Sequence, residues 1–425
     1  MRLLDAPQAP GARAPSPARL AGAPARGSSE RDRDPHLHLY GALTPAQSLD
    51  LTQGHPVDWG WLAGRWREAG LTPPDFATLA RRHRAGEPVL AALTIEASGF
   101  ASFQARYDLV IACSRWASGR HDRWSGDTAA EVTQVCALVA REHGPAEARV
   151  LVPGTAADAW VEPALDHLAT ATAAHGLHLA LSLPRAQPLR HWPLVAAAAA
   201  RHACITGIDL CGIEDEPSAH APLAAAIAAW NRQHGRSLAL LVHVGEQLRG
   251  VQPLSAVRRV WDAVALGADR LGHALAVRLD PSAWPATPAW ERTDERRARL
   301  AWLQWQAADL GLDAEAIDHQ LAALADRDPA AQLAAEPSDP GLLRACQEAV
   351  LARIRQAGRT VEVCPTSNCV VSGAPLASHG IERLSAAGVA WGVGSDDPGI
   401  LGTTWAKEVA LASGTADPTN HTAER

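Results

Sequence analysis

Eight short apolar segments alternate with helical segments along most of the chain, and this alternation limits the folds open to it. Continuous apolar strands separated by helices predict a parallel sheet that is buried on both faces. Eight such units favour an α/β fold of the (β/α)8 TIM-barrel type. A doubly wound open sheet is the alternative, but no glycine-rich dinucleotide fingerprint follows any strand. The segments are HLHL (36–39), ARVLVPG (148–154), LHLALSL (177–183), ITGIDLCG (205–212), LALLVHVGE (238–246), DRLGHA (269–274), TVEVCPTSN (360–368) and VAWGVGSDDP (389–398).

The predicted barrel domain covers residues 34–415, with helical patterns over about 45–143 before the second strand. Residues 1–33 are rich in Ala, Pro, Gly, Ser and Arg and predict a disordered tail, and residues 416–425 form a C-terminal tail. The first strand is expected to be short and irregular, because polar residues precede it and Pro35 lacks a ladder donor.

One connection, about residues 280–340 after the sixth strand, is far longer than a normal strand-to-helix link. It contains two helical patterns, within 291–311 and 313–327. Because the connection leaves the C-terminal end of a strand, we expect it to pack over the barrel mouth as a lid or rim. The alternatives are a contact with a second subunit and an insertion that packs against the side of the barrel.

Composition narrows the class of protein. The chain has 425 residues, 47% of them hydrophobic, which is typical of a soluble globular protein. A net charge of −7 argues against a nucleic-acid partner. No apolar run is long enough for a membrane span, and the start of the chain has no signal-peptide core. The seven cysteines form no CxxC pair, which favours a reducing, cytoplasmic location. The oligomeric state is not predicted.

Polar side chains fall at the C-terminal ends of separate strands, where barrel enzymes build their sites. His36 and His38 share one face of a strand, because side chains at i and i+2 point the same way. With His243 and Asp396 they make a suitable set for Zn²⁺ or a similar ion. His243 could instead be a hydrogen-bonded core histidine, and Asp396 a helix cap.

Three further residues beside this set could serve the chemistry of a metal-activated water. Glu246 lies three residues past His243 and could exchange a proton beside the metal. His273 could hold or deprotonate the attacking water. Asp397 follows Asp396 and would face the substrate.

Six motifs, HLHLYGAL, IDLCG, VHVGE, RLGHA, VEVCPTSN and GSDDPGIL, occur in an order that resembles the adenosine deaminase family of metal-dependent purine deaminases. The resemblance covers roughly residues 36–412 and implies one Zn²⁺ per chain on His36, His38, His243 and Asp396. It implies hydrolytic deamination of an adenine-type nucleoside, such as adenosine or deoxyadenosine, with release of ammonia.

The resemblance also implies a role for each remaining site residue. Glu246 would protonate the purine ring nitrogen N1, and His273 would orient the hydroxide that attacks C6. Asp397 would hydrogen-bond N7, and the backbone N–H of Gly212 would reach N3. The only lysine, Lys407, lies past the last strand, so a bridging carboxylated lysine between two metals is not expected.

Tyr40 departs from the family pattern, because an acidic residue that contacts the sugar normally stands at this position. A phenol is bulkier and neutral at pH 7. We therefore expect Tyr40 to contact the substrate and to alter specificity. The alternatives are deamination of adenine or of a 5′-modified adenine nucleoside, or a catalytically reduced family member that acts as a binding protein.

Overall fold

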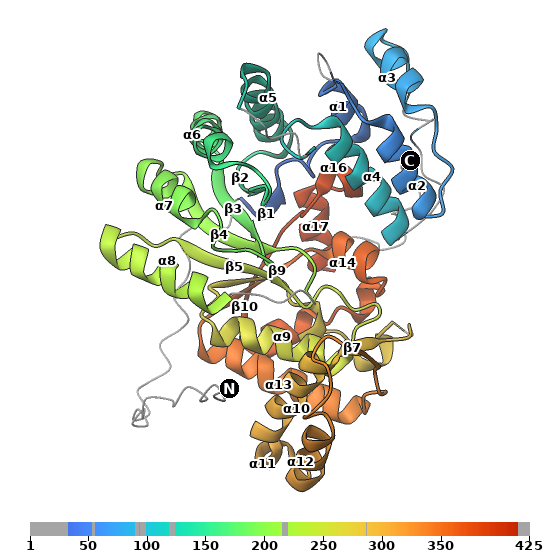
Figure 1. The fold of residues 1–425 in the computed structure, drawn as a ribbon, viewed down its shortest axis with the longest axis vertical. Coiled ribbons are helices and arrows are strands. Elements are labelled where there is room, and N and C mark those ends of the chain that lie inside the picture. The colour runs from blue at the N-terminus through green and yellow to red at the C-terminus, as the bar shows by residue number, and fades with distance from the viewer. Residues whose placement is uncertain are drawn as a thin grey trace. The chain divides into compact units, whose positions relative to one another are not determined.

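Eight parallel strands form one sheet in the part of the chain that the structure describes. The computed structural model describes residues 33–52, 56–89, 93, 99–118, 124–214, 220–285 and 287–414. The strands pair in the order β1-β2-β3-β4-β5-β6-β9-β10 (Figure 1). They are β1 (Asp34–His38), β2 (Ala146–Leu151), β3 (His178–Pro184), β4 (Ile205–Cys211), β5 (Ala239–Val244), β6 (Arg270–His273), β9 (Thr360–Val363) and β10 (Ala390–Val393).

The sheet closes on itself between β1 and the end of β10. The backbone N–H of His38 donates to the carbonyl of Asp396 at 2.7 Å, and the N–H of Asp396 donates to the carbonyl of His36 at 2.8 Å. The predicted (β/α)8 barrel is therefore confirmed, and the doubly wound alternative is wrong. β1 is short and its register shifts between Asp34 and Leu37, as its sequence predicted.

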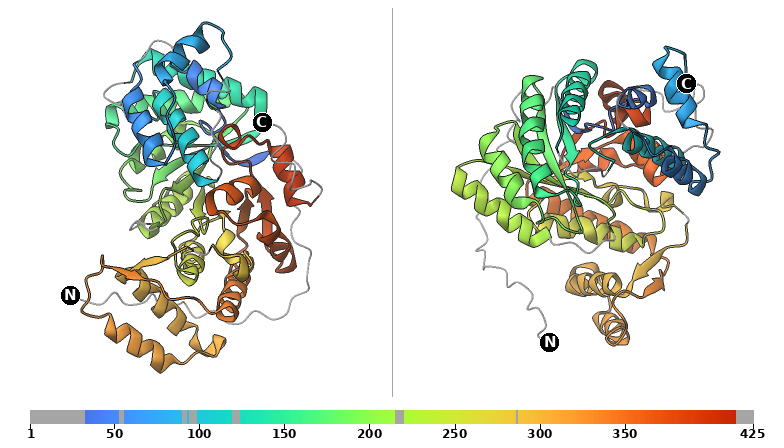
Figure 2. Two further views of the ribbon diagram at one scale, coloured as in Figure 1. Left: turned by 90° about the vertical axis from the view of Figure 1, so that its right-hand side faces the viewer. Right: turned by 45° about the horizontal axis from the view of Figure 1, so that its top comes forward.

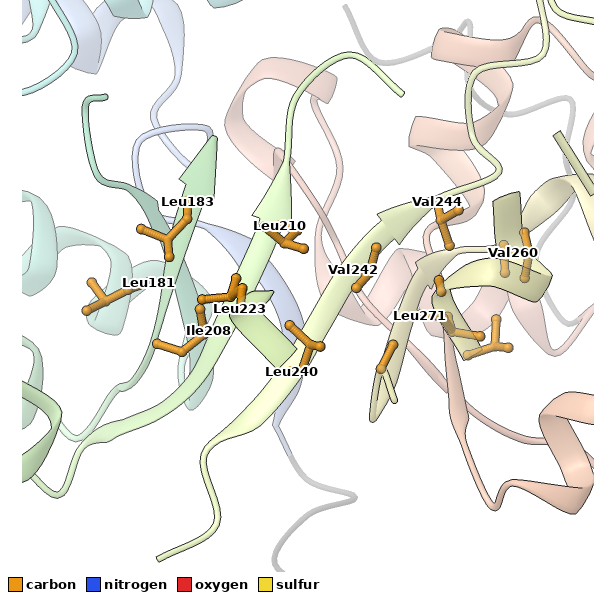
Figure 3. Close-up of a cluster of buried hydrophobic side chains, with 14 of the residues drawn as sticks. Leu181, Leu183, Ile208, Leu210, Leu223, Leu240, Val242, Val244, Val260 and Leu271 are labelled. Atoms are coloured by element: carbon orange, nitrogen blue, oxygen red, sulfur yellow. The ribbon is translucent and has the colours of Figure 1, made fainter. Parts of the chain in front are cut away.

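Helices surround the barrel and cover the outward-facing side chains of its strands. Figure 3 shows part of this layer, where Val242 and Val244 of β5 lie among side chains that include Leu223 and Val260. The helices that follow strands are α6 (Asp158–Ala174), α7 (Trp192–Arg201), α8 (His220–His234), α9 (Pro253–Ala265), α13 (Pro340–Gln356), α14 (Pro365–Ser372), α15 (Ile381–Ala386), α16 (Pro398–Leu401) and α17 (Trp405–Ala412).

The described residues between β1 and β2 include five α-helices. Four of them enclose a smaller apolar core of their own, which includes Trp66, Phe76 and Leu109. The helix from Phe100 also packs against α14 and α16, so this part of the chain lies next to the ends of β9 and β10. The five are α1 (Pro45–Asp50), α2 (Trp59–Glu68), α3 (Phe76–Arg84), α4 (Phe100–Cys113) and α5 (Gly126–His143).

The long connection after β6 packs beside the barrel. Its helix α10 (Thr293–Trp305) packs against α9, and α11 (Ala307–Leu310) packs against α13. Figures 1 and 2 show this insertion, with α12 (Ala314–Ala323), next to those helices and not over the strand ends. This packing favours the alternative of an insertion against the side of the barrel over a lid, and a role at the rim of the barrel mouth stays a prediction.

Two short strands, β7 (Trp290–Arg292) and β8 (Gln332–Ala334), pair antiparallel within the insertion. The N–H of Trp290 donates to the carbonyl of Gly250 at 3.0 Å, which ties the insertion to the loop after β5. The predicted tails, 1–33 and 416–425, lie outside the described residues, apart from Arg33. None of the helices in the described ranges is long and apolar enough to cross a bilayer.

Small residues make room for the histidines inside the barrel. A Cβ atom built on Gly394 would lie 2.4 Å from Cβ of His36 and 2.9 Å from the His36 carbonyl oxygen. A Cβ atom on Gly272 would lie 3.1 Å from Cε1 of His36. Glycine at these two positions therefore allows β6 and the segment after β10 to approach the β1 histidine closely.

We predict that Gly394→Ala destabilises the fold by about 1–3 kcal/mol, because the added methyl group overpacks against the backbone of β1. Gly392→Ala is the matched control, since a Cβ atom there would meet only Cγ of Pro35, at 3.8 Å. Urea unfolding of both variants measures the difference. Equal stability of the two variants would contradict this account of the barrel interior.

Candidate active site

The four residues predicted as metal ligands meet at the C-terminal ends of the strands. Nε2 of His36 lies 3.0 Å from Nε2 of His243 and 3.3 Å from Oδ1 of Asp396. Nδ1 of His38 lies 2.9 Å from the same Asp396 oxygen. His36, His243 and Asp396 are buried, whereas the side chain of His38 is 27% exposed. The alternation of side chains along β1, which the HLH motif predicted, thus directs both His36 and His38 towards Asp396.

His273 and Asp396 point into this cluster because their backbones adopt positive φ angles, 63° and 64°. Side chains alternate along a strand, so a regular end of β6 would direct His273 to the same face as Leu271, outside the barrel. Nδ1 of His273 instead contacts Oδ1 of Asn368 at 2.9 Å, and its Nε2 lies 3.3 Å from Oε2 of Glu246. Strained backbone at these two positions places two chemical groups in the site.

The donor set fits a divalent metal ion. Ligand atoms of His36, His243, His273 and Asp396 lie within 4.8 Å of one another, and so do those of His38, Asp396 and Asp397. Nitrogen and oxygen ligands on a tetrahedral zinc lie roughly 3.3 Å apart, close to the separations observed here. Nε2 of His273 and Oδ1 of Asp396 are buried, and their contacts with Glu246 and with the histidines lack hydrogen-bond geometry, so both atoms are without a hydrogen-bond partner among the described residues.

Buried carboxylates orient the other nitrogens of two candidate ligands. Oε2 of Glu362 lies 3.1 Å from Nδ1 of His36, and Oδ1 of Asp209 lies 3.0 Å from Nδ1 of His243. In metal sites such carboxylates fix the ring so that Nε2 faces the ion. Burial lowers the pKa of His243 to about 3, so this ring is neutral and able to bind a metal at pH 7.

Glu246 lies in the loop after β5, and Glu214 holds the backbone of that loop. Oε2 of Glu214 accepts a hydrogen bond from the N–H of Gly245 at 2.9 Å. Its Oε1 accepts from the N–H groups of Glu246 and Gln247, both at 3.0 Å. Burial raises the pKa of Glu246, which favours a protonated carboxyl group beside His273. The sequence did not single out Glu214, because no local pattern reveals a carboxylate that binds a loop 31 residues later.

Tyr40, predicted to contact substrate, directs its hydroxyl group towards α5. The hydroxyl donates to Oε1 of Glu131 at 3.1 Å, and the same oxygen accepts from the Ser114 hydroxyl at 2.8 Å. Burial, and then the negative charge of Glu131, raise the pKa of Tyr40 well above its ordinary value. This hydroxyl group is therefore engaged by the protein, and only the ring of Tyr40 remains for a substrate contact.

Asp397 and Gly212 also lie at strand ends. Oδ1 of Asp397 is 3.3 Å from Nδ1 of His38, and burial raises the pKa of Asp397. A Cβ atom on Gly41 would lie 1.7 Å from that Asp397 oxygen, so glycine at position 41 lets the carboxyl group pack against the chain after β1. Gly212 has a φ of 106°, and a side chain there would meet open space.

Tyr107 is a further residue near the site that the sequence analysis did not select. It lies on α4, where its ring stacks beside Phe103 with centroids 6.0 Å apart. Burial, and then the nearby charge of Asp397, raise the pKa of the Tyr107 phenol. The signal in the sequence was the clustering of aromatic residues: the chain has five Phe and Tyr residues in all, and three of them lie at positions 100, 103 and 107.

A family model described as adenosine deaminase matches residues 303–424. An aminodeoxyfutalosine deaminase from Acidothermus cellulolyticus is 41% identical over 75 residues, which are 17% of this chain and 21% of that protein. An adenine deaminase from Agrobacterium fabrum is 44% identical over 73 residues, 17% of this chain and 22% of that protein. The chain thus matches about a fifth of the length of these curated relatives.

Solved structures resemble the chain over nearly its full length. An N6-methyl-AMP deaminase from Arabidopsis thaliana superposes with a TM-score of 0.52 at 14% identity, covering 92% of this chain and 88% of that one. A zinc-bound amidohydrolase from Burkholderia ambifaria gives 0.51 at 14% identity, covering 92% and 82%. At this identity the likeness shows the barrel fold. The similarity to the adenosine deaminase family is thus found in residues 303–424 and in local matches to two deaminases, on a chain whose overall fold is that of the solved barrel structures.

Proposed function

We propose that the protein is a metal-dependent hydrolase that deaminates an adenine-type nucleoside to the inosine-type product and ammonia. The observation that carries this proposal is the convergence of a metal-ligand set with Glu246 and His273 at one barrel mouth. Nε2 of His273 is 3.3 Å from the carboxyl group of Glu246. A site that only bound a ligand would have no need of two proton-exchanging groups beside a metal.

His36, His38, His243 and Asp396 would hold one divalent ion, with zinc as the expected metal. Such an ion supplies Lewis acidity that activates water near neutral pH. The structure also brings His273 within the reach of this set, and we assign it to the water and not to the ion, because Asn368 orients its ring and Nε2 faces Glu246.

The side chains around the ion would carry the protons of the reaction. Protonated Glu246 donates its proton to N1 of the purine, which makes C6 electrophilic. His273 accepts a hydrogen bond from the attacking water and holds it beside C6. Asp397, with its raised pKa, can donate a hydrogen bond to N7, and the N–H of Gly212 faces N3. Water adds at C6, one of its protons passes by way of His273 to the exocyclic amine, which leaves as ammonia, and the other returns to Glu246 as the C6 carbonyl forms.

Adenine is a second candidate substrate. The adenine deaminase similarity favours it, and so does Tyr40, which stands where the family carries an acidic sugar contact. The hydroxyl group of Tyr40 is bound to Glu131 and does not replace that acid. A free base needs no sugar contact, whereas a nucleoside would have to find one elsewhere in the site.

The function is tested by metal analysis and by ammonia release from adenine, adenosine, deoxyadenosine, aminodeoxyfutalosine and N6-methyl-AMP. We expect about one metal ion per chain and turnover of at least one of these compounds. Glu246→Gln should keep the metal and lose about 10²–10⁴-fold in turnover, because an amide cannot deliver the N1 proton. A metal-loaded protein that releases no ammonia from any of them would favour the binding-protein alternative.

We predict that Glu214→Gln lowers kcat by at least about tenfold while metal content stays unchanged. The glutamine amide would place an NH₂ group against one of three backbone N–H groups, and each charge-assisted bond contributes about 1.5–3 kcal/mol. Glu336→Gln is the matched control, because the side chain of Glu336 is 70% exposed and lies outside the site. A native kcat in Glu214→Gln would show that the hydrogen bonds between Glu214 and the loop of Glu246 are not needed for turnover.

We predict that Tyr107→Leu changes the ratio of kcat/KM between adenine and adenosine, because the phenol group of the 36% exposed Tyr107 lies near the charge of Asp397, which is proposed to contact the purine. Tyr40→Phe should leave that ratio within about twofold and lower Tm, since it removes a bond to Glu131. Steady-state kinetics on both substrates measures the two ratios. A changed kcat/KM ratio in Tyr40→Phe but not in Tyr107→Leu would show that Tyr40, and not Tyr107, determines specificity.

A further inference from the structure

A second cavity lies on the outer side of β5, away from the candidate active site. Its volume is about 530 Å³, and its walls come from β5, α8, α9 and the insertion. Val242 and Val244 line it. His243, between them in the strand, faces the barrel interior, because side chains alternate along β5. The strand itself therefore separates this cavity from the metal-ligand cluster.

Four buried nitrogen atoms of the cavity wall have no hydrogen-bond partner in the described part of the chain. They are Nε of Arg185, Nε2 of His220, Nε of Arg258 and Nη1 of Arg259. Arg185 is only 3% exposed. A buried donor without a partner costs free energy, so a cluster of them around one cavity indicates a ligand that supplies acceptor oxygens.

The acidic groups of the same wall already have partners. Glu295 accepts hydrogen bonds from Arg258 at 2.7 Å and from Arg259 at 3.1 Å, and Asp262 pairs with Arg258. The two carboxylates therefore balance the two guanidinium groups.

The remaining acids are occupied as well. Glu291 pairs with Arg296 and Arg299, Asp294 pairs with Arg292, and Glu214 accepts the three N–H groups of the loop after β5. The unpartnered atoms on this wall are thus on the basic side chains.

Of the four arginines on this wall, which also carries five carboxylates, Arg185 is the one without a carboxylate partner among the described residues. Its Nη2 donates a hydrogen bond to the carbonyl oxygen of His243. Burial, and then the charge of Arg185, lower the pKa of His220 to about 4, so His220 is neutral and offers one N–H.

We propose that this cavity is a second binding site, for a small phosphate-bearing anion. Guanidinium groups match the geometry and charge of phosphate oxygens, and Arg185 and Arg259 present such groups to the cavity. The volume of about 530 Å³ has room for more than one phosphate group, and the exposed Trp290 also lines the wall. Because Arg185 also holds the backbone of His243, an anion bound here would act on the strand that carries a candidate metal ligand.

Isothermal titration of the metal-loaded full-length protein with pyrophosphate and with inorganic phosphate tests the site directly. We expect saturable binding of one pyrophosphate per chain, weakened at least tenfold in Arg259→Gln. His220→Leu should also weaken pyrophosphate binding. This second variant keeps the test valid if Arg259→Gln fails to fold. Arg344→Gln is the matched control, since it removes the same charge from a side chain that pairs with Asp280 outside the cavity.

Two further titrations identify the source of the phosphate. Displacement of pyrophosphate by AMP but not by adenosine assigns the site to nucleotides, and no displacement by AMP assigns it to free phosphates; both outcomes retain the second site. Displacement by adenosine would place the anion in the barrel mouth and overturn the proposal. Absence of saturable binding, or unchanged affinity in both cavity variants, would overturn it as well. These readouts do not depend on ammonia release, so they are separate from the test of the proposed function.

Discussion

The rest of the structure depends on an ion network buried at the barrel axis. Arg149 of β2 contacts Asp209 of β4 at 3.3 Å and also bonds Glu362 of β9. Burial alone would raise the pKa of Glu362, but Arg149 and its neighbours hold it well below its ordinary value. The same two carboxylates face His36 and His243, so the charges that join the strands also orient the candidate metal ligands. Removing one member of such a buried set typically costs about 3–5 kcal/mol.

This network also explains why a cation suits the site. Arg270 of β6 bonds Glu147 and Glu362, so two arginines face three carboxylates inside the barrel. Asp396 and Asp397 add further carboxyl groups at its mouth. Most TIM barrels fill this space with branched apolar side chains. Here the interior carries an excess of negative charge in a low-dielectric setting, and a divalent ion bound by neutral histidines offsets it.

The sequence predicted the strands and the motif histidines because both depend on local alternation, and it erred where distant contacts decide. No local pattern assigned a contact to Asp34, yet it is buried and accepts hydrogen bonds from the N–H of His36 and from Ser395, 361 residues away. The positive φ of His273 likewise has no signal in the local sequence. The insertion was predicted as a lid or rim from where it leaves the barrel, whereas its helices α10 and α11 pack against α9 and α13.

The position of the insertion gives it a different link to the site. Its strand β7 bonds the carbonyl of Gly250, and Thr287 accepts a hydrogen bond from the N–H of the same glycine at 2.9 Å. The loop that carries Glu246 is therefore held at one end by Glu214 and at the other by the insertion. A general acid must stay within hydrogen-bond reach of its target atom. An insertion beside the barrel can thus set the position of Glu246 without covering the mouth, and the second cavity lies between that insertion and β5.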